Sequence, residues 1–177
     1  VYTADAALNM VYLPLGNATP DYYGGGRRPF DDAYNSSIVA LDITSGTPRW
    51  HFQTTHHDVW DMDLPIGPSL VDLQINGTST PALVQSTKRG EFFVLDRRTG
   101  QPLVKTIEKP VPTNGVPGDT LSPTQPYPVG MPSLTPANLA ESRLWGATPL
   151  DQLICRIQFR QAAYQGQFTP PQLRKAI

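Results

Sequence analysis

Short apolar runs separated by turn residues dominate the chain. Apolar and polar residues alternate over residues 69–75, and Asn76-Gly77 follows directly, which predicts a β-hairpin. The other runs of strand length are rich in apolar or β-branched residues and are bounded by Gly, Pro, Asn or Asp; they cover residues 10–15, 37–41, 48–53, 81–86, 91–96 and 157–168. The pattern therefore predicts an all-β architecture.

Helix signals are confined to two places. Thr135-Pro136 is typical of a helix start and predicts a short helix through Ala137 to Glu141. A second short helix is expected near Pro149 to Cys155. Residues 110–136 are rich in proline and are expected to form a long irregular excursion, of the kind that is usually functional.

An internal repeat links two of the predicted strand pairs. Residues 40–50 are echoed by residues 94–104, and each copy reads as an apolar strand, an Asp, a three-residue turn, a Gly and a second strand. The Asp can accept hydrogen bonds from the turn, and the Gly supplies a positive φ. A four-stranded unit repeated at about 40–50 residues indicates a propeller blade, although two ordinary hairpins would also give two copies. The equivalent positions, 54 residues apart, are Asp42 with Asp96 and Gly46 with Gly100.

Composition narrows the function classes. The chain has 177 residues with 19 Pro and 14 Gly, which disfavours long helices, and its net charge of -1 gives no broad basic face for nucleic acid. The single cysteine excludes an intrachain disulfide and a cysteine-based zinc site. No stretch has the apolar length of a membrane span, and both ends look cut, so we expect a piece of a larger protein.

Residues 56–63 are the densest group of polar chemistry. Two imidazoles, three carboxylates and an indole stand in eight residues, and such groups are costly to bury without partners. A metal ligand or a general base is expected here. Strand alternation would separate the two histidines, which argues against joint chelation of one ion. The expected faces are His56, Asp58 and Trp60 on one side and His57, Val59 and Asp61 on the other.

The repeat resembles the tryptophan docking motif of quinoprotein alcohol dehydrogenases, in which the Trp packs between neighbouring blades of an eight-bladed propeller. Trp50 is that residue in the first copy, whereas Val104 replaces it in the second. Four stretches resemble the membrane-bound glucose/quinate-type dehydrogenases that use pyrroloquinoline quinone (PQQ): residues 11–20, 56–65, 88–97 and 144–156. The last six residues, 172–177, are unlike that branch and suggest a truncation or a reading-frame accident.

The resemblance implies an all-β chain that forms about two to three blades of an eight-bladed β-propeller. Residues 1–177 would be one partial PQQ-binding domain. Blade material is expected at about 1–109 and 156–171, and the Pro-rich loop with one or two short helices at about 110–155.

The resemblance also implies an activity. It is the oxidation of a sugar or cyclic polyol by hydride transfer to PQQ, with glucose favoured and quinate or shikimate as the alternative. Electrons would pass to ubiquinone through a membrane domain outside this chain, at the periplasmic face of the bacterial inner membrane. The family's quinone-stacking Trp would precede Val1, so the chain alone is expected neither to bind PQQ tightly nor to turn over.

Five residues take roles from the resemblance. Asp61 maps to the base that takes the hydroxyl proton, beside a Ca²⁺ (or Mg²⁺) ion. Lys88, 27 residues later, maps to the lysine at the quinone oxygens, and Thr19 to a threonine near the cofactor. His57 and Trp60 are expected near the substrate or in support of Asp61.

Each role has a structural alternative. Trp-Asp pairs also anchor turns in propellers, and a Lys-Arg-Gly turn usually places its Lys in solvent. Thr19 would cap a local turn, and Trp60 would pack within a blade. At the level of function, the alternatives are a non-catalytic propeller scaffold and a small histidine–metal hydrolase that would retain Zn²⁺.

Overall fold

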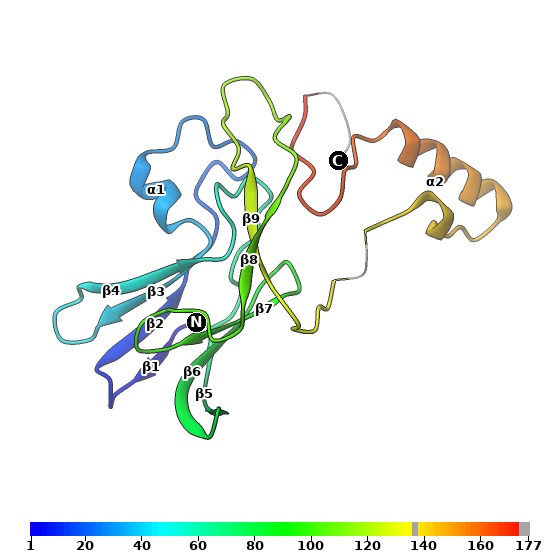
Figure 1. Ribbon diagram of the computed structural model, residues 1–177. Helices are drawn as coiled ribbons and strands as arrows, with labels where there is room; N and C mark the ends of the chain where they lie inside the picture. Colours follow the sequence, from blue (N-terminus) through cyan, green and yellow to red (C-terminus); the bar gives the residue numbers. More distant parts are fainter. Residues whose placement is uncertain (136–137, 174–177) are drawn as a thin grey trace.

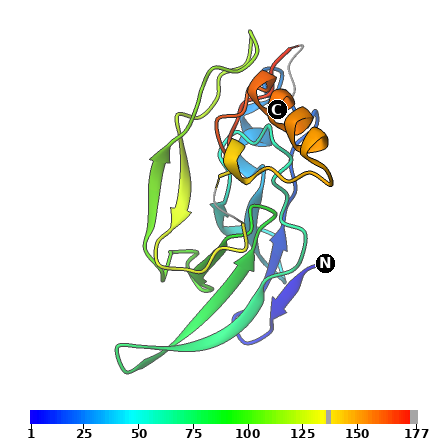
Figure 2. The ribbon, with the colours of Figure 1, turned by 90° about the vertical axis from the view of Figure 1, so that its right-hand side faces the viewer.

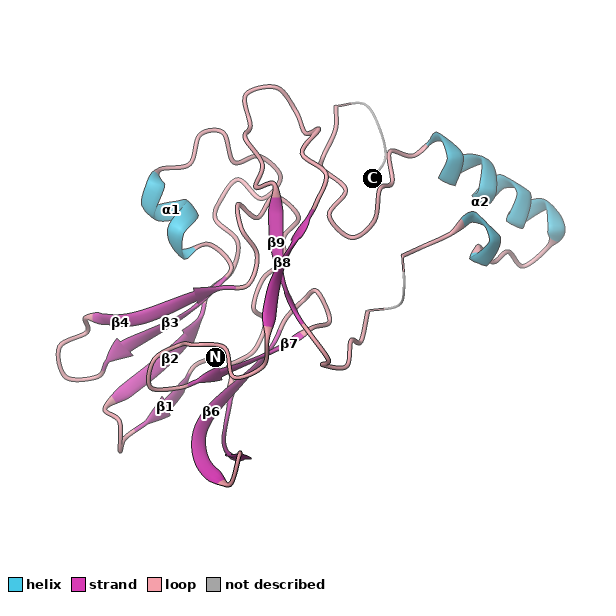
Figure 3. Ribbon diagram, viewed as in Figure 1, coloured by secondary structure: helices cyan, strands magenta, loops and turns pink. Residues whose placement is uncertain are grey.

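The computed structural model describes residues 1–135 and 138–173, and residues 3–53 contain a four-stranded antiparallel sheet (Figures 1 and 3). The strands follow one another in space in the order β1-β2-β3-β4. The strands predicted at residues 10–15, 37–41 and 48–53 are confirmed. The bounds are β1 Thr3–Asp5, β2 Met10–Pro14, β3 Ser37–Asp42 and β4 Pro48–Gln53.

A second antiparallel sheet has the order β5-β6-β7, with bounds β5 Ser69–Ile75, β6 Thr78–Ser86 and β7 Phe92–Asp96. Asn76 and Gly77 join β5 to β6 with φ of 52° and 77°, so the predicted hairpin turn is present. Pro102 forms an isolated β-bridge with Leu95, at the edge of β7 where a fourth strand of the sheet would lie. The two sheets are open, as expected for part of a propeller.

The hydrophobic core joins the two sheets. Tyr12 and Ile38 of the first sheet pack in one buried cluster with Leu83 and Phe93 of the second, and Leu64 enters the cluster from the connection between the sheets. Residues 56–63, the octapeptide, therefore lead directly into the interior that holds the sheets together.

The repeat forms two equivalent turns. Asp42 Oδ1 accepts the main-chain N–H groups of Thr44 and Ser45, at 3.0 and 2.9 Å. Asp96 Oδ1 accepts the N–H of Arg98 at 2.9 Å in the same way. The glycines that close the turns, Gly46 and Gly100, have φ of 70° and 74°. Both predicted roles are confirmed, because the carboxylate caps the turn and the glycine takes the left-handed conformation.

The Pro-rich segment contains a strand that the sequence did not predict. β8 (Thr106–Pro110) pairs with β9 (Thr124–Pro128) in a two-stranded ribbon along one side of the molecule (Figure 2). The expectation of irregular chain from Pro110 to Pro136 is wrong at β9. Proline is tolerated at sheet edges, and both strands of a two-stranded ribbon are edges, so Pro126 and Pro128 do not prevent pairing.

The helix expected at 137–141 is wrong in its described part, and Pro136 and Ala137 lie outside the described residues. Leu139 and Ala140 are not helical. The N–H of Leu139 donates to Tyr164 Oη at 2.9 Å, and the main chain of Ala140 is extended. A single turn of 3-10 helix follows at Glu141–Arg143. A short helix that the sequence did not predict, α1, spans Pro29–Tyr34.

The second predicted helix is confirmed and is longer than expected. α2 spans Pro149–Gln161, opened by a capping box between Thr148 and Asp151, and it extends away from the strands (Figure 1). The strand expected at 157–168 is wrong, and so are strands at 156–171. Apolar residues recur at the helical spacing of 150, 153, 154 and 157, which favours continuation of α2. Among the described residues no helix is long and apolar enough to cross a membrane.

Candidate active site

The octapeptide is a tight irregular loop between β4 and β5, and the expected strand alternation is wrong. His57 and Asp61 have φ of 41° and 62°, values that belong to the left-handed region. Asp58 is fully buried, and its carboxylate accepts main-chain N–H groups further along the same loop. Burial raises the pKa of Asp58 above its ordinary value. The partners that such polar groups need when they are buried are thus supplied by the loop itself and by its neighbours.

Asp61 and Lys88 meet at one point of this loop. Lys88 Nζ lies 2.6 Å from Asp61 Oδ2 and 3.5 Å from Asp63 Oδ2. The hairpin that carries Lys88 lies against the loop, because the main-chain N–H of Lys88 donates to the carbonyl of Asp63 at 3.3 Å. The side chains of Asp61 and Lys88 are 33% and 45% exposed, so solvent and small molecules can reach the pair.

The ion pair sets the charge state of both groups. The hydrogen bond from Lys88 lowers the pKa of Asp61 below its ordinary value, and Asp61 raises the pKa of Lys88. Near neutral pH the pair is therefore a carboxylate beside an ammonium group.

Thr19 is exposed and lies in the loop that leads from β2 towards α1. That loop touches the same site, since Asp63 Oδ1 accepts the N–H of Asn17 at 2.7 Å. Arg27 holds the loop from the other side by donating to the carbonyls of Ala18 and Pro20, at 2.8 and 2.9 Å. The fold thus brings the Thr19 loop, Asp61 and Lys88 to one end of the two sheets.

His57 is held between two carboxylates. Its Nδ1 lies 3.0 Å from Asp32 Oδ1 and its Nε2 lies 2.6 Å from Asp119 Oδ1. The hydrogen bond with Asp32, followed by that with Asp119, raises the pKa of His57. Both ring nitrogens are occupied, so neither is available to Asp61. His57 thereby ties the octapeptide to α1 and to the Pro-rich segment.

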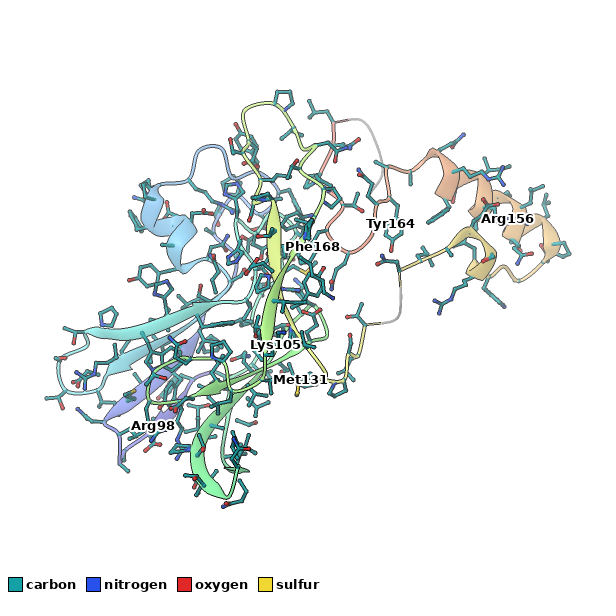
Figure 4. The ribbon with its side chains drawn as sticks, viewed as in Figure 1. Arg98, Lys105, Met131, Arg156, Tyr164 and Phe168 are labelled. Carbon is teal, nitrogen blue, oxygen red and sulfur yellow. The ribbon has the colours of Figure 1, made fainter. Side chains whose placement is uncertain are left out.

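Trp60 packs against the segment that follows α2. Its Nε1 donates to the carbonyl of Thr169 at 2.8 Å, and its ring meets Phe168 edge-on at 5.0 Å. Figure 4 places Phe168 beside β9 and Tyr164 in the stretch that returns from α2. An apolar pocket of about 370 Å³ lies here, lined by Tyr22, Trp60, Met62, Leu139, Tyr164, Gly166, Gln167 and Thr169.

The sequence reasoning missed the importance of Arg89. Its guanidinium is buried, forms an ion pair with Glu91 at 2.7 Å, and donates to the carbonyls of Thr54 and Pro126. It also lies over the ring of Phe168 at 4.8 Å. In the Lys-Arg-Gly turn, Lys88 therefore pairs with Asp61 at the surface, whereas Arg89 is buried in the interior. The sequence shows only that both residues are basic.

The described residues do not provide a complete set of metal ligands. Among residues 1–135 and 138–173, no group of three or more His, Cys, Asp or Glu residues is arranged to hold a metal ion. Asp61 and Asp63 do offer adjacent hard oxygen atoms, the type that Ca²⁺ prefers. The solvent-accessible ammonium of Lys88 beside them suits an electron-rich oxygen such as that of a quinone.

Comparison with known proteins decides the family. The model of the PQQ family, described as "Glucose/ethanol/alcohol dehydrogenase, beta-propeller domain", matches residues 1–177. This chain belongs to that family. The resemblance drawn from the docking repeat and the octapeptide is therefore confirmed.

Three relatives have nearly the same sequence identity to this chain. The glycerol dehydrogenase large subunit of Gluconobacter oxydans (strain 621H) is 50% identical over 98% of the chain. The quinate/shikimate dehydrogenase (quinone) of Acinetobacter baylyi and the quinoprotein glucose dehydrogenase of Escherichia coli (strain K12) are each 49% identical over 94% of it. The chain covers 24% of the first relative and 21% of each of the others, about a quarter or less of their lengths.

A solved structure supports the fold of this family member. The quinohemoprotein alcohol dehydrogenase from Comamonas testosteroni is 34% identical and superposes with a TM-score of 0.54. The match covers 73% of this chain and 19% of that chain. The open sheets described above are thus part of a propeller.

Proposed function

We propose that this chain supplies the proton-accepting carboxylate and the quinone-facing cation of a PQQ-dependent dehydrogenase that oxidises a hydroxyl group of a sugar or polyol. The observation that carries the proposal is the ion pair of Asp61 and Lys88, 2.6 Å apart and accessible from solvent. The family assignment supports PQQ as the cofactor.

Asp61 is the proposed base. A base must be deprotonated and within hydrogen-bond reach of the substrate hydroxyl, and the lowered pKa of Asp61 meets the first condition at neutral pH. PQQ, when bound, supplies the electrophilic acceptor for the hydride. Lys88 holds a positive charge where negative charge develops, and the Thr19 loop would border the cofactor from the other side.

The proposed metal is Ca²⁺ or Mg²⁺, held beside Asp61 with further ligands from outside this chain. The support is the chemistry of the donors, since the carboxylate oxygens of Asp61 and Asp63 suit a hard cation. The proposal predicts that a chelator lowers activity and that Ca²⁺ restores it.

The proposed substrate is glucose, with quinate or shikimate as the alternative. Relatives named for glucose, quinate and glycerol have 49–50% identity to the chain, so identity does not rank the substrates. We also propose ubiquinone as the electron acceptor and the periplasmic face of the inner membrane as the location. The support for a quinone acceptor is the word "quinone" in the name of the quinate/shikimate relative.

The test uses the full-length protein with PQQ and Ca²⁺, and follows dye reduction with glucose, quinate, shikimate and glycerol in turn. Asp61→Asn should abolish turnover and leave PQQ binding mostly intact. Asp72→Asn is the matched control, because Asp72 is also an accessible carboxylate paired with a cation, Arg97, at 2.8 Å. Full activity of Asp61→Asn would place the base elsewhere, and PQQ-dependent glucose oxidation by the 177-residue chain alone would contradict the expected need for further blades.

A further inference from the structure

We propose that Asp58 is a positioning residue that fixes the main chain on both sides of Asp61 and thereby aims the Asp61 carboxylate. The inference rests on the proposed function, in which Asp61 is the base. Asp58 does not reach the solvent-accessible pair, because its side chain is fully buried. It acts through the loop, and the proton transfer itself belongs to Asp61.

The two oxygens of Asp58 bracket Asp61. Oδ1 accepts the N–H of Trp60 at 2.8 Å, and Oδ2 accepts the N–H of Met62, also at 2.8 Å. Trp60 and Met62 are the residues immediately before and after Asp61. Asp61 itself has φ of 62°, a conformation that non-glycine residues avoid unless the surroundings hold it. The bracket supplies that hold on both flanks.

Asp58 is itself anchored to the first sheet. Ser36 Oγ donates to Oδ2 at 2.5 Å, and Arg27 Nη1 donates to the main-chain carbonyl of Asp58 at 2.6 Å. Ser36 directly precedes β3 and is fully buried. Asp58 thereby connects the main chain around Asp61 to the start of β3.

Two acceptor oxygens are required in this arrangement. An amide at position 58 keeps one oxygen and replaces the other by an NH2 donor, which cannot accept either N–H. One flank of Asp61 would then lose its partner and the loop would shift. Misplacement of a reacting group by about 1 Å costs about 100-fold in rate.

The test compares Asp58→Asn with wild type in the full-length protein loaded with PQQ and Ca²⁺. We expect kcat to fall by about 10- to 100-fold. KM and the Kd of PQQ should stay within about twofold, because the groups that bind substrate and cofactor are unchanged. Asp42→Asn is the matched control: Asp42 also accepts two main-chain N–H groups, but in the turn after β3. It should leave kcat unchanged.

The outcomes separate this inference from the proposed function. If Asp61→Asn abolishes turnover but folded Asp58→Asn retains wild-type kcat, the positioning role is wrong and the proposed base stands. A parallel loss of PQQ affinity and kcat in Asp58→Asn would indicate general disruption and would also overturn the inference. If Asp58→Asn does not fold, Ser36→Ala decides, with an expected fall in kcat of about threefold at constant KM; an unchanged kcat would overturn the inference.

Discussion

The indole of Trp50 lies against Gly100, so that the first sheet rests on the turn that closes the second repeat. A β-carbon added at Gly100 would come within 2.5 Å of Trp50 Cε3. Trp50 Nε1 also donates to the carbonyl of Arg97 in the same turn at 3.3 Å, and Tyr12 Oη donates to that carbonyl at 2.9 Å. The docking residue of one copy is therefore seated on the glycine of the next.

Gly100→Ala should destabilise the protein more than Gly46→Ala. Both positions have a positive φ, which costs an alanine about 1–2 kcal/mol. Gly46 has no atom within 4 Å of an added β-carbon, whereas Gly100 faces Trp50. The overpacking should add about 1–3 kcal/mol at Gly100 alone. Urea unfolding of the two variants measures the difference, and equal losses would show that Trp50 yields freely.

Lys88→Gln should move the acid limb of the pH–rate profile to higher pH. Lys88 lowers the pKa of Asp61, so its removal raises that pKa and reduces the ionised fraction at acid pH. The measurement is kcat/KM against pH in the full-length protein. Arg98→Gln is the control, because Arg98 also pairs with an aspartate, Asp96, at 2.6 Å but in a blade turn. An acid limb that stays in place in Lys88→Gln would argue that Asp61 is not the titrating base.

Stability should fall as the pH rises above about 6.5, through the titration of His57. The pKa of His57 is raised in the folded state, so its stabilising contribution is complete below the unfolded value and is lost through the folded value. Asp32→Asn removes the largest cause of the raised pKa and should flatten this dependence. Asp31→Asn, one residue away on α1 and paired with Arg28, should retain it. Thermal unfolding at pH 5.5, 6.5, 7.5 and 8.5 distinguishes the two variants.

Arg89→Met should cost about 3–5 kcal/mol of stability. The variant leaves Glu91 without its cation, and the carbonyls of Thr54 and Pro126 without their donor. Arg160→Met is the control on the surface, where Glu141 keeps its second partner, Arg156. The two unfolding midpoints in urea should differ clearly. A loss as small as that of Arg160→Met would mean that water replaces the buried guanidinium.

The blades were predictable because their signals are local. Asp42 and Gly46 define a turn within five residues, and Asn76-Gly77 defines another, so the strands on either side follow. β9 was missed because its prolines argue against a strand unless the edge position is known. The second half of α2, after Cys155, was missed because Ile157 and Phe159 also suit a strand.

The site was only partly predictable. Asp61 and Lys88 are 27 residues apart, and the family resemblance predicted that both serve one site but not that they form an ion pair. No local signal joins His57 to Asp119, 62 residues later in the Pro-rich segment. The bracket formed by Asp58 was missed because the expected strand would have turned it to the opposite face from Asp61.

The amide of Gln125 links the Pro-rich ribbon to the octapeptide. Its Oε1 accepts the N–H of His56 and its Nε2 donates to the carbonyl of His56, both at 2.7 Å, so one side chain satisfies both main-chain groups of a residue, as a neighbouring strand would. Because these bonds reach only main-chain atoms, the octapeptide can be exchanged for that of a relative without losing them, provided that Gln125 is kept. Gln125 thus fixes the start of the octapeptide independently of its side chains, although the two bonded residues lie 69 positions apart along the chain.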